Sequence, residues 1–243
     1  MKDYLLDLIQ HTNGLGVIEL VKVNGTQTET KISALSEDRN VIVNGTFKTP
    51  IVEFDGVFGM PNLSKLKTIL GFDDYGEDST IALIREDKEG VLVPASIHFE
   101  TASKDFINDY RLMKKGTVED RVPAVTFKGA NWNVEFAPTV AGIMRLKKQA
   151  SANSEENNFK TTTENGDLKV YFGDHSTHSG NFVFHPGVTG TLSRPWQWPV
   201  KVFLSIMDLS GDKVVRISDD GAVEITVDSG LAIWQYLLPA QAK

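Results

Sequence analysis

The residues of this sequence best suited to binding a metal ion lie between Asp174 and His185. Asp174, His175 and His178 are close in sequence, and His185 follows them. Imidazole and carboxylate groups together form common sites for divalent transition metals. The His-x-x-His spacing falls in a polar loop instead of on a helix, and no second carboxylate cluster accompanies it. The pattern therefore favours no metal site and no metal-dependent catalysis.

Other catalytic motifs lack the residues that their chemistry needs. The sequence has no phosphate-binding glycine loop of the Walker or dinucleotide type. Gly187, Gly190 and Ser193 are near one another but do not have the spacing of a nucleophile elbow. There is no cysteine, which excludes disulfides and thiolate ligands. We therefore expect a protein that is not an enzyme and that needs no cofactor.

Two tryptophans leave a further kind of binding chemistry open. Trp196 and Trp198 lie between two prolines, and exposed aromatic rings of this kind could stack on a carbohydrate. The alternative, which we favour, is that both rings cover the beginning of a helix expected over residues 198–209.

The segment Gly59–Leu70 predicts a short amphipathic helix with a basic outer face. Pro61 suits the first helical turn, and Gly71 follows as a C-cap. At about 100° per residue, one face collects the apolar side chains of Leu63, Leu66, Ile69 and Leu70. The opposite face carries Ser64 and Thr68, flanked by Lys65 and Lys67.

Three more amphipathic helices are expected, two of them with basic residues outside. Residues 2–12 place Leu5, Leu6, Leu8 and Ile9 inside and Asp3, Asp7 and His11 outside. Residues 138–150 place Val140, Ile143, Met144 and Ala150 inside and Gly142, Arg145, Lys148 and Gln149 outside. Residues 198–209 place Val200, Val202, Phe203, Ile206 and Met207 inside and Lys201, Ser205 and Asp208 outside.

The remaining pattern is that of strands joined by Asn-Gly turns at 24–25, 44–45 and 165–166. In the first half we expect strands at residues 16–23, 26–32, 40–44, 47–54, 80–85 and 90–100. In the second half we expect them at residues 123–127, 131–136, 159–163, 167–172, 181–185, 213–218, 222–227 and 231–238. Each half then repeats the order helix, strands, helix, strands, which indicates a duplicated α+β architecture. Residues 101–121 have no sustained period, so we expect a first domain at 1–105, a connector at 106–121 and a second domain at 122–243.

The composition restricts the class of protein further. The chain has 243 residues and a formal net charge of −7, which counts against generic nucleic-acid binding. It leaves room for a basic surface confined to one face. No apolar run resembles a signal peptide or a membrane span, so we expect no membrane contact and a place in the cytoplasm.

The order of elements resembles that of a DNA sliding clamp over nearly the whole chain. Two stretches are similar residue by residue. Residues 59–70, Gly-Met-Pro-Asn-Leu-Ser-Lys-Leu-Lys-Thr-Ile-Leu, look like the second helix of clamps of the proliferating-cell-nuclear-antigen type. Residues 210–240, which end in Tyr-Leu-Leu-Pro-Ala, look like the final strands and tail of these clamps. Length and the loose first domain look closer to the clamps of tailed phages, the accessory proteins of their DNA polymerases.

The resemblance implies a DNA-clamp fold that assembles into a ring. Two-domain clamps close as head-to-tail homotrimers, with helices around the hole and sheets outside. The ring encircles duplex DNA without reading its sequence and tethers the replicative DNA polymerase, and a clamp-loader ATPase places it on DNA. If phage-encoded, this protein would act in the cytoplasm of the host cell. The residues expected to face DNA are Lys65, Lys67, Arg145, Lys148 and Lys201.

Clamps of this class also bind short apolar peptides of their partners. By position, Tyr110, Leu112 and Met113 of the connector and Pro239 of the tail are the candidates for that pocket. Alternatives remain at each site. The lysines are equally compatible with a solvated surface, and the connector residues with anchoring the connector to the body. For the whole chain, the alternative is a phage structural protein, a virion β-sandwich without a role on DNA.

Overall fold

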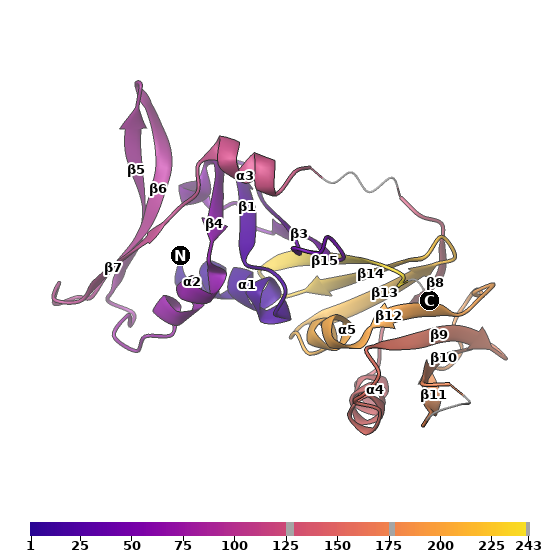
Figure 1. Cartoon of the computed structure of the whole chain (residues 1–243). Helices are drawn as coiled ribbons and strands as arrows, with labels where there is room; N and C mark the ends of the chain where they lie inside the picture. Colours follow the sequence, from indigo (N-terminus) through magenta and orange to yellow (C-terminus); the bar gives the residue numbers. More distant parts are fainter. Residues whose placement is uncertain (125–128, 175–177, 242–243) are drawn as a thin grey trace. The chain divides into compact units, whose positions relative to one another are not determined.

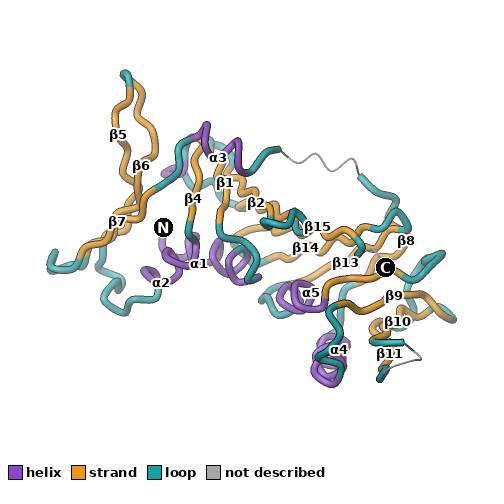
Figure 2. The backbone as a smooth tube through the Cα atoms, in the orientation of Figure 1, coloured by secondary structure: helices purple, strands orange, loops and turns teal. Residues whose placement is uncertain are grey.

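The computed structural model describes residues 1–124, 129–174 and 178–241 (Figures 1 and 2). These residues form two compact units. The first contains the described residues up to Ala124 together with residues 229–234, and the second contains the described residues 129–228 and those from Gln235 onward. The last strand, β15 (Ala232–Pro239), therefore contributes residues to both units.

The first unit has three α-helices, two short 3-10 turns and two antiparallel groups of strands. Its helical elements are α1 (Lys2–His11), η1 (Asn13–Leu15), η2 (Val52–Phe54), α2 (Leu63–Leu70) and α3 (Lys115–Arg121). Four of its strands are neighbours in the order β4-β1-β2-β3, and β15 follows β3: β1 (Leu20–Gly25), β2 (Thr30–Leu35), β3 (Ile42–Phe47) and β4 (Gly56–Pro61). A second sheet has the order β5-β6-β7, formed by β5 (Thr80–Lys88), β6 (Val91–Glu100) and β7 (Ile107–Arg111).

The second unit has two α-helices, α4 (Val140–Ala152) and α5 (Val200–Met207). A four-stranded sheet has the order β11-β10-β9-β12, formed by β9 (Asn158–Glu164), β10 (Asp167–Phe172), β11 (Gly180–His185) and β12 (Trp196–Pro199). The end of β15 continues the order β14-β13-β8, formed by β8 (Trp132–Phe136), β13 (Asp212–Ser218) and β14 (Ala222–Asp228). The expected α+β class, with two helices per half packed with antiparallel strands, is confirmed, and α3 is an additional helix.

Two of the three expected Asn-Gly turns are wrong. Asn24 and Gly25 end strand β1, and the chain turns at Thr26–Glu29, where the Thr26 N–H donates to the Glu29 carbonyl over 2.8 Å. Asn44 and Gly45 lie inside β3. A Cβ atom on Gly45 would approach the Trp234 ring to 2.5 Å, so this glycine makes room for a ring from the far end of the chain.

The third turn, at Asn165 and Gly166, is confirmed. The two residues have φ angles of 55° and 85° and join β9 to β10. Positive φ at both central positions is the requirement of the tight hairpin turn that Asn-Gly favours.

The second helix begins later than its sequence pattern indicates. Pro61 ends strand β4, and Asn62, with a φ of 55°, separates that strand from α2. The expectation that Pro61 occupies the first helical turn is therefore wrong. The buried face is as expected, because Leu63, Leu66, Ile69 and Leu70 are all buried.

The predicted faces of two helices need correction. In α1, Asp7 and His11 are buried and Leu6 is exposed, the reverse of the expectation. In α4, the buried residues are Gly142, Leu146 and Ala150, whereas Val140 is 79% and Met144 48% exposed. Hydrophobicity alone assigned these residues to the wrong faces. The helix α1 buries the polar residues Asp7 and His11, and α4 buries Gly142, which has no side chain.

The last expected helix also begins two residues later. Trp198 lies in β12, and α5 begins at Val200. Because a proline disfavours helical conformation in the residue before it, Pro199 keeps Trp198 extended. The first two residues of the expected strand at 123–127, Pro123 and Ala124, are not in a strand, and 125–127 lie outside the described residues.

Residues 106–121, expected as a connector, contain β7 and α3 and count with the first unit. Strand β7 pairs with β6, from Ser96 opposite Arg111 to Glu100 opposite Ile107. Where one domain ends and the next begins stays a prediction.

Candidate nucleic-acid interface

The basic face of α2 is held by an apolar face that packs into the first unit. Lys65 and Lys67 are exposed, while the four apolar residues of this helix are buried. Ser64 and Thr68, the other exposed residues of this helix, are polar. The helix therefore presents two ammonium groups without an apolar patch around them.

A carboxylate from another segment fixes the first turn of α2. Asn62 precedes the helix in a left-handed conformation and makes no side-chain cap. Glu19 takes over that role: its carboxylate accepts from the Ser64 hydroxyl over 2.7 Å and from the Ser64 N–H over 3.3 Å. It also accepts from the Asn13 side-chain amide over 2.8 Å. A negative charge at a helix N-terminus is favourable, because it meets unpaired N–H groups and the positive end of the helix dipole.

The neighbouring helix α1 contributes less negative charge to the surface than its sequence indicates. The Asp7 carboxylate is buried and accepts from the Trp234 indole N–H over 2.9 Å. The His11 Nδ1 atom donates to the Asp7 carbonyl over 2.9 Å, and its ring stacks on Trp234 with centroids 5.1 Å apart. The exposed residues of the helix are Asp3, Leu6 and Gln10. Asp3 is thus the one exposed acidic residue of α1.

In the second unit, two helices that contact each other carry exposed basic residues. Arg145 and Lys148 on α4 and Lys201 on α5 are all exposed. Lys147 of α4 is different, because it pairs with Asp208 just beyond α5. A shallow hollow of about 400 Å³ lies between these helices, and Lys147, Ser151, Ser154 and Lys201 contribute to its lining.

The start of α4 is capped by its own sequence. The Thr139 hydroxyl accepts from the Gly142 N–H over 3.0 Å. Gly142 itself is buried, and a Cβ atom there would come within 2.6 Å of the Phe184 carbonyl oxygen on β11. The close approach of α4 to β11 therefore depends on a residue without a side chain.

The connector residues named as a peptide pocket have different surroundings. Tyr110 is buried, its hydroxyl donates to the Pro61 carbonyl, and burial raises its pKa. Met113 exchanges two backbone hydrogen bonds with Gly59, of 2.8 and 2.9 Å, and the Leu112 N–H donates to the Ala95 carbonyl. Leu112 and Met113 are half-buried, and Pro239, in the second unit, is exposed. These contacts hold β7 and the segment after it against the first unit.

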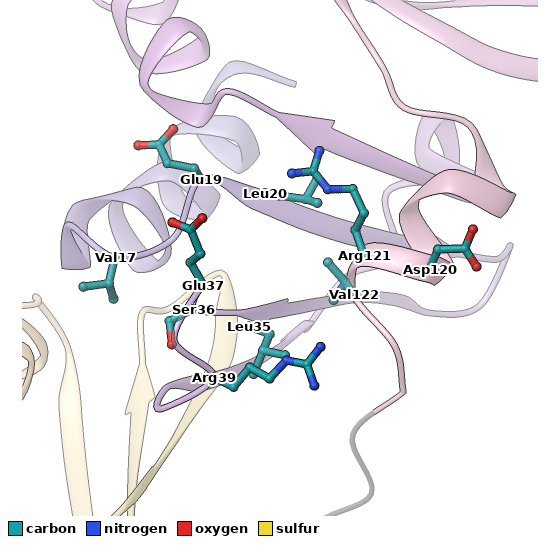
Figure 3. A pocket seen from close by; sticks show the side chains of 10 residues that line it. All are labelled: Val17, Glu19, Leu20, Leu35, Ser36, Glu37, Arg39, Asp120, Arg121 and Val122. Atoms are coloured by element: carbon teal, nitrogen blue, oxygen red, sulfur yellow. The ribbon is translucent and has the colours of Figure 1, made fainter.

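A hollow of about 380 Å³ lies beside this segment, and we call it the connector hollow. Three separate segments line it: the start of β1, the end of β2 with its turn, and the end of α3. Figure 3 shows the Glu19 and Glu37 carboxylates on one side and the Arg121 guanidinium on the other. The complete lining is Val17, Glu19, Leu20, Leu35, Ser36, Glu37, Arg39, Asp120, Arg121 and Val122.

Sequence reasoning missed both Glu19 and the connector hollow. The residues that line the connector hollow come from three segments without a shared motif. Only the pairing of β1 with β2 and the position of α3 bring them together. A hydrogen bond of 3.0 Å from the Lys22 ammonium group to the Val122 carbonyl secures the end of α3 at this place.

The tryptophan pair does not form an open stacking surface. Trp198 is fully buried and donates to the Thr161 hydroxyl over 2.8 Å. The Arg194 guanidinium covers the Trp196 ring at 4.0 Å from its centroid, and a Cβ atom on Gly221 would lie 2.9 Å from that ring. These contacts leave little ring surface for a sugar.

Among the described residues, no group of three or more His, Asp and Glu side chains is placed to hold a metal ion. His175, named with Asp174 and His178 as a possible ligand, lies outside the described residues. Within the described part of the chain, no helix is both long and apolar enough to cross a membrane.

The fold of the described residues can be compared with known proteins. No protein-family model matches the chain, and no curated protein matches it. Solved structures do match, and the fold is that of the PCNA sliding clamps.

Two of these structures match over nearly their whole length. One is PCNA from Thermococcus kodakaraensis, with a TM-score of 0.68, 13% sequence identity, and coverage of 99% of this chain and 97% of that chain. The other is A. fulgidus PCNA with the C-terminal region of FEN-1 bound, with a TM-score of 0.69, 9% identity, and coverage of 98% and 96%. At such low identity the likeness establishes the fold and leaves the activity to be argued. The likeness to tailed-phage clamps stays a prediction.

Proposed function

We propose that this protein is a sliding clamp, which encircles duplex DNA and tethers a DNA polymerase for processive synthesis. The observation that carries the proposal is that three helices, α2 in the first unit and α4 and α5 in the second, present exposed basic side chains in a fold shared with PCNA. Other exposed basic residues lie on strands, turns and α3. A clamp is a scaffold, so we expect no catalytic activity of its own.

The proposed DNA contacts are Lys65, Lys67, Arg145, Lys148 and Lys201. Contacts from ammonium and guanidinium groups to phosphates carry no sequence information and weaken with salt, which suits a protein that slides. The body of the protein is acidic, with a net charge of −7, so unspecific adhesion elsewhere on its surface is disfavoured.

The proposed assembly is a closed homotrimer. In a head-to-tail ring each contact joins two different surfaces, so a strand edge of one unit meets a strand edge of the other unit in the next copy. Two edge strands suit this: β7 ends the order β5-β6-β7 in the first unit, and β11 ends the order β11-β10-β9-β12 in the second. Ile107 of β7 is 49% exposed, which a pairing partner would cover.

The proposed partners are a DNA polymerase and a clamp-loader ATPase. The A. fulgidus PCNA structure contains the C-terminal region of FEN-1. By analogy we place a peptide from such a partner in the connector hollow. Tyr110, Leu112, Met113 and Pro239, the candidates from the sequence, are not among the residues that line it, and their part in peptide binding stays a prediction. The PCNA fold does not favour the virion alternative.

The first test of the proposal is the solution mass, measured by light scattering. A trimer has three times the mass of the 26.8 kDa chain, about 80 kDa. If the ring closes only with the help of its loader, the protein alone would be a monomer and would form a trimer during loading. A monomer that never trimerises, even with loader and DNA present, would contradict the clamp assignment.

The second test is a charge reversal on the proposed DNA face. The variant Lys65→Glu, Arg145→Glu, Lys148→Glu, Lys201→Glu should remain folded, because all four side chains are exposed. Loss of four phosphate contacts predicts a drop in DNA retention of about tenfold or more at moderate salt. The matched control reverses Lys31, Lys48, Lys104 and Arg194, which are exposed as well and lie on strands or turns. Equal retention by both variants would reject the assigned DNA face.

A further inference from the structure

A second hollow of the first unit combines an apolar floor with a basic rim, and we call it the hairpin hollow. It lies between the β5–β6 hairpin, the start of β4 and the start of α3, and Figure 1 shows this hairpin extending from the rest of its unit. Its volume is about 410 Å³, within the range of roughly 300–1,000 Å³ typical of ligand sites. It shares no lining residue with the connector hollow.

The floor of the hairpin hollow exposes large apolar side chains. Val91 is 61% and Leu92 63% exposed at the beginning of β6. They continue into Val93 and Pro94, and Val57 lies on the facing strand. Adjacent exposed apolar residues around a concavity are a feature of surfaces that bind another molecule, because covering them removes apolar area from water.

The rim of the hairpin hollow carries four basic side chains and one acidic one: Arg85, Lys88, Lys114, Lys115 and Asp55. The Arg85 guanidinium donates to the Glu53 carbonyl over 3.1 Å and to the Asp55 carbonyl over 2.6 Å. These neutral acceptors orient the guanidinium but do not cancel its charge. The Asp55 carboxylate accepts from the Gln27 side-chain amide over 3.3 Å.

Lys88 and Lys114 lie beside each other, and the Glu86 carboxylate acts on both. Lys88 pairs with Glu86 over 2.9 Å. No carboxylate of the described residues forms an ion pair with Lys114 or Lys115. The neighbouring Lys88 side chain lowers the pKa of Lys114, since two ammonium groups disfavour each other. A bound carboxylate would relieve this repulsion.

We propose that the hairpin hollow binds a short peptide segment of a protein partner, in which an apolar side chain is flanked by Asp or Glu residues. The apolar side chain covers Val91, Leu92 and Pro94, and the carboxylates meet Lys88, Lys114 and Lys115. Duplex DNA would satisfy the lysines but has no flexible apolar group for the floor, so the combination favours a peptide. This site is separate from the proposed DNA face and does not depend on ring closure.

The test uses the full-length protein and two defined hexapeptides. The probe is acetyl-Asp-Asp-Leu-Phe-Asp-Asp-amide, and the reference is acetyl-Asn-Asn-Leu-Phe-Asn-Asn-amide. Amide NMR shifts during titration report both the dissociation constant and the residues contacted. We expect the acidic probe to shift Val91, Leu92 and Lys114, and we expect the reference to bind at least about fivefold more weakly, because it lacks the carboxylates that meet the lysines.

Two variants separate the charge from the apolar floor. Lys88→Glu, Lys114→Glu should weaken the acidic probe about tenfold, and Leu92→Ser about fivefold, since both change exposed residues and leave the core intact. The matched control is Lys31→Glu, Lys104→Glu, which removes two exposed lysines of the same unit outside the hollow. It should bind the probe as the parent protein does.

Three results would overturn the proposal. The first is a probe whose shifts map outside the hairpin hollow. The second is equal binding of the acidic and the amide peptide. The third is a 12-base-pair DNA duplex that shifts Val91, Leu92 and Lys114 more strongly than the probe, which would identify the surface as a nucleic-acid contact. None of them bears on the trimer mass or on DNA retention, so failure here is distinct from failure of the clamp assignment.

Discussion

The two units present basic helices to solvent but hold these helices by different means. In the first unit, polar contacts from other segments position α1 and α2: the buried Asp7 of α1 accepts from Trp234, and the exposed Glu19 caps α2. In the second unit, α4 reaches β11 through the small residue Gly142, caps itself with Thr139, and contacts α5 through an exposed ion pair. The comparison teaches that similar surfaces can rest on interiors with very different tolerance to substitution.

The largest effect should follow from removing the buried acceptor of the first unit. Asp7→Ala leaves the Trp234 indole N–H without its acceptor and opens space beside His11. We expect a loss of about 3 kcal/mol in the free energy of unfolding, from urea titration followed by fluorescence. Asp7→Asn keeps an acceptor oxygen and should lose clearly less. Equal losses in both variants would show that charge, and not the hydrogen bond, holds the helix.

The next effect compares one glycine from each unit. Gly45→Ala forces a Cβ atom against the Trp234 ring, and Gly142→Ala forces one against the Phe184 carbonyl. Overpacking of this kind costs about 1–3 kcal/mol, but Ala gains about 1 kcal/mol over Gly inside a helix, so Gly142→Ala should lose less. Gly116→Ala on α3, where a Cβ atom has open space, is the control. A control as unstable as Gly45→Ala would remove the packing argument.

A smaller effect distinguishes a cap supplied from afar from a local one. Glu19→Ala should cost about 1–2 kcal/mol, since it loses a capping carboxylate and leaves the Ser64 hydroxyl without its acceptor. Thr139→Ala removes only the local cap of α4 and should cost about 1 kcal/mol. Hydrogen exchange should show faster opening of α2 in the first variant and of α4 in the second. Faster opening of α4 in the Glu19→Ala variant would contradict the assignment of Glu19 as the cap of α2.

The smallest effect concerns the exposed pair between α4 and α5. Lys147→Ala should change the free energy of unfolding by about 0.5 kcal/mol or less, because exposed ion pairs contribute little after solvent screening. Added salt should change the stability of this variant less than that of the parent protein, because the screened ion pair is gone. A loss approaching that of Asp7→Ala would mean that the second unit also depends on a polar contact.

Much of the candidate interface was predictable from periodicity. The basic face of α2 follows from four apolar residues at helical spacing, and the structure buries all four. For α4, Arg145 and Lys148 are exposed and Ala150 is buried as expected, although the buried face differs because Gly142, expected outside, carries little hydrophobic signal. The connector hollow was not predictable, since its lining depends on three segments that meet only in the folded chain.

By itself the sequence determined the α+β class, the duplicated order of elements, the Asn165–Gly166 turn and the exposed lysines, because these depend on local backbone preference and on the period of apolar residues. Only the tertiary structure decided which Asn-Gly pairs turn and which polar residues are buried. Gly45 lies within a strand because the Trp234 ring occupies the space above it, and Asp7 is buried because that same tryptophan offers it a donor. Both outcomes depend on residues nearly two hundred or more positions away, a distance at which sequence patterns contain no signal.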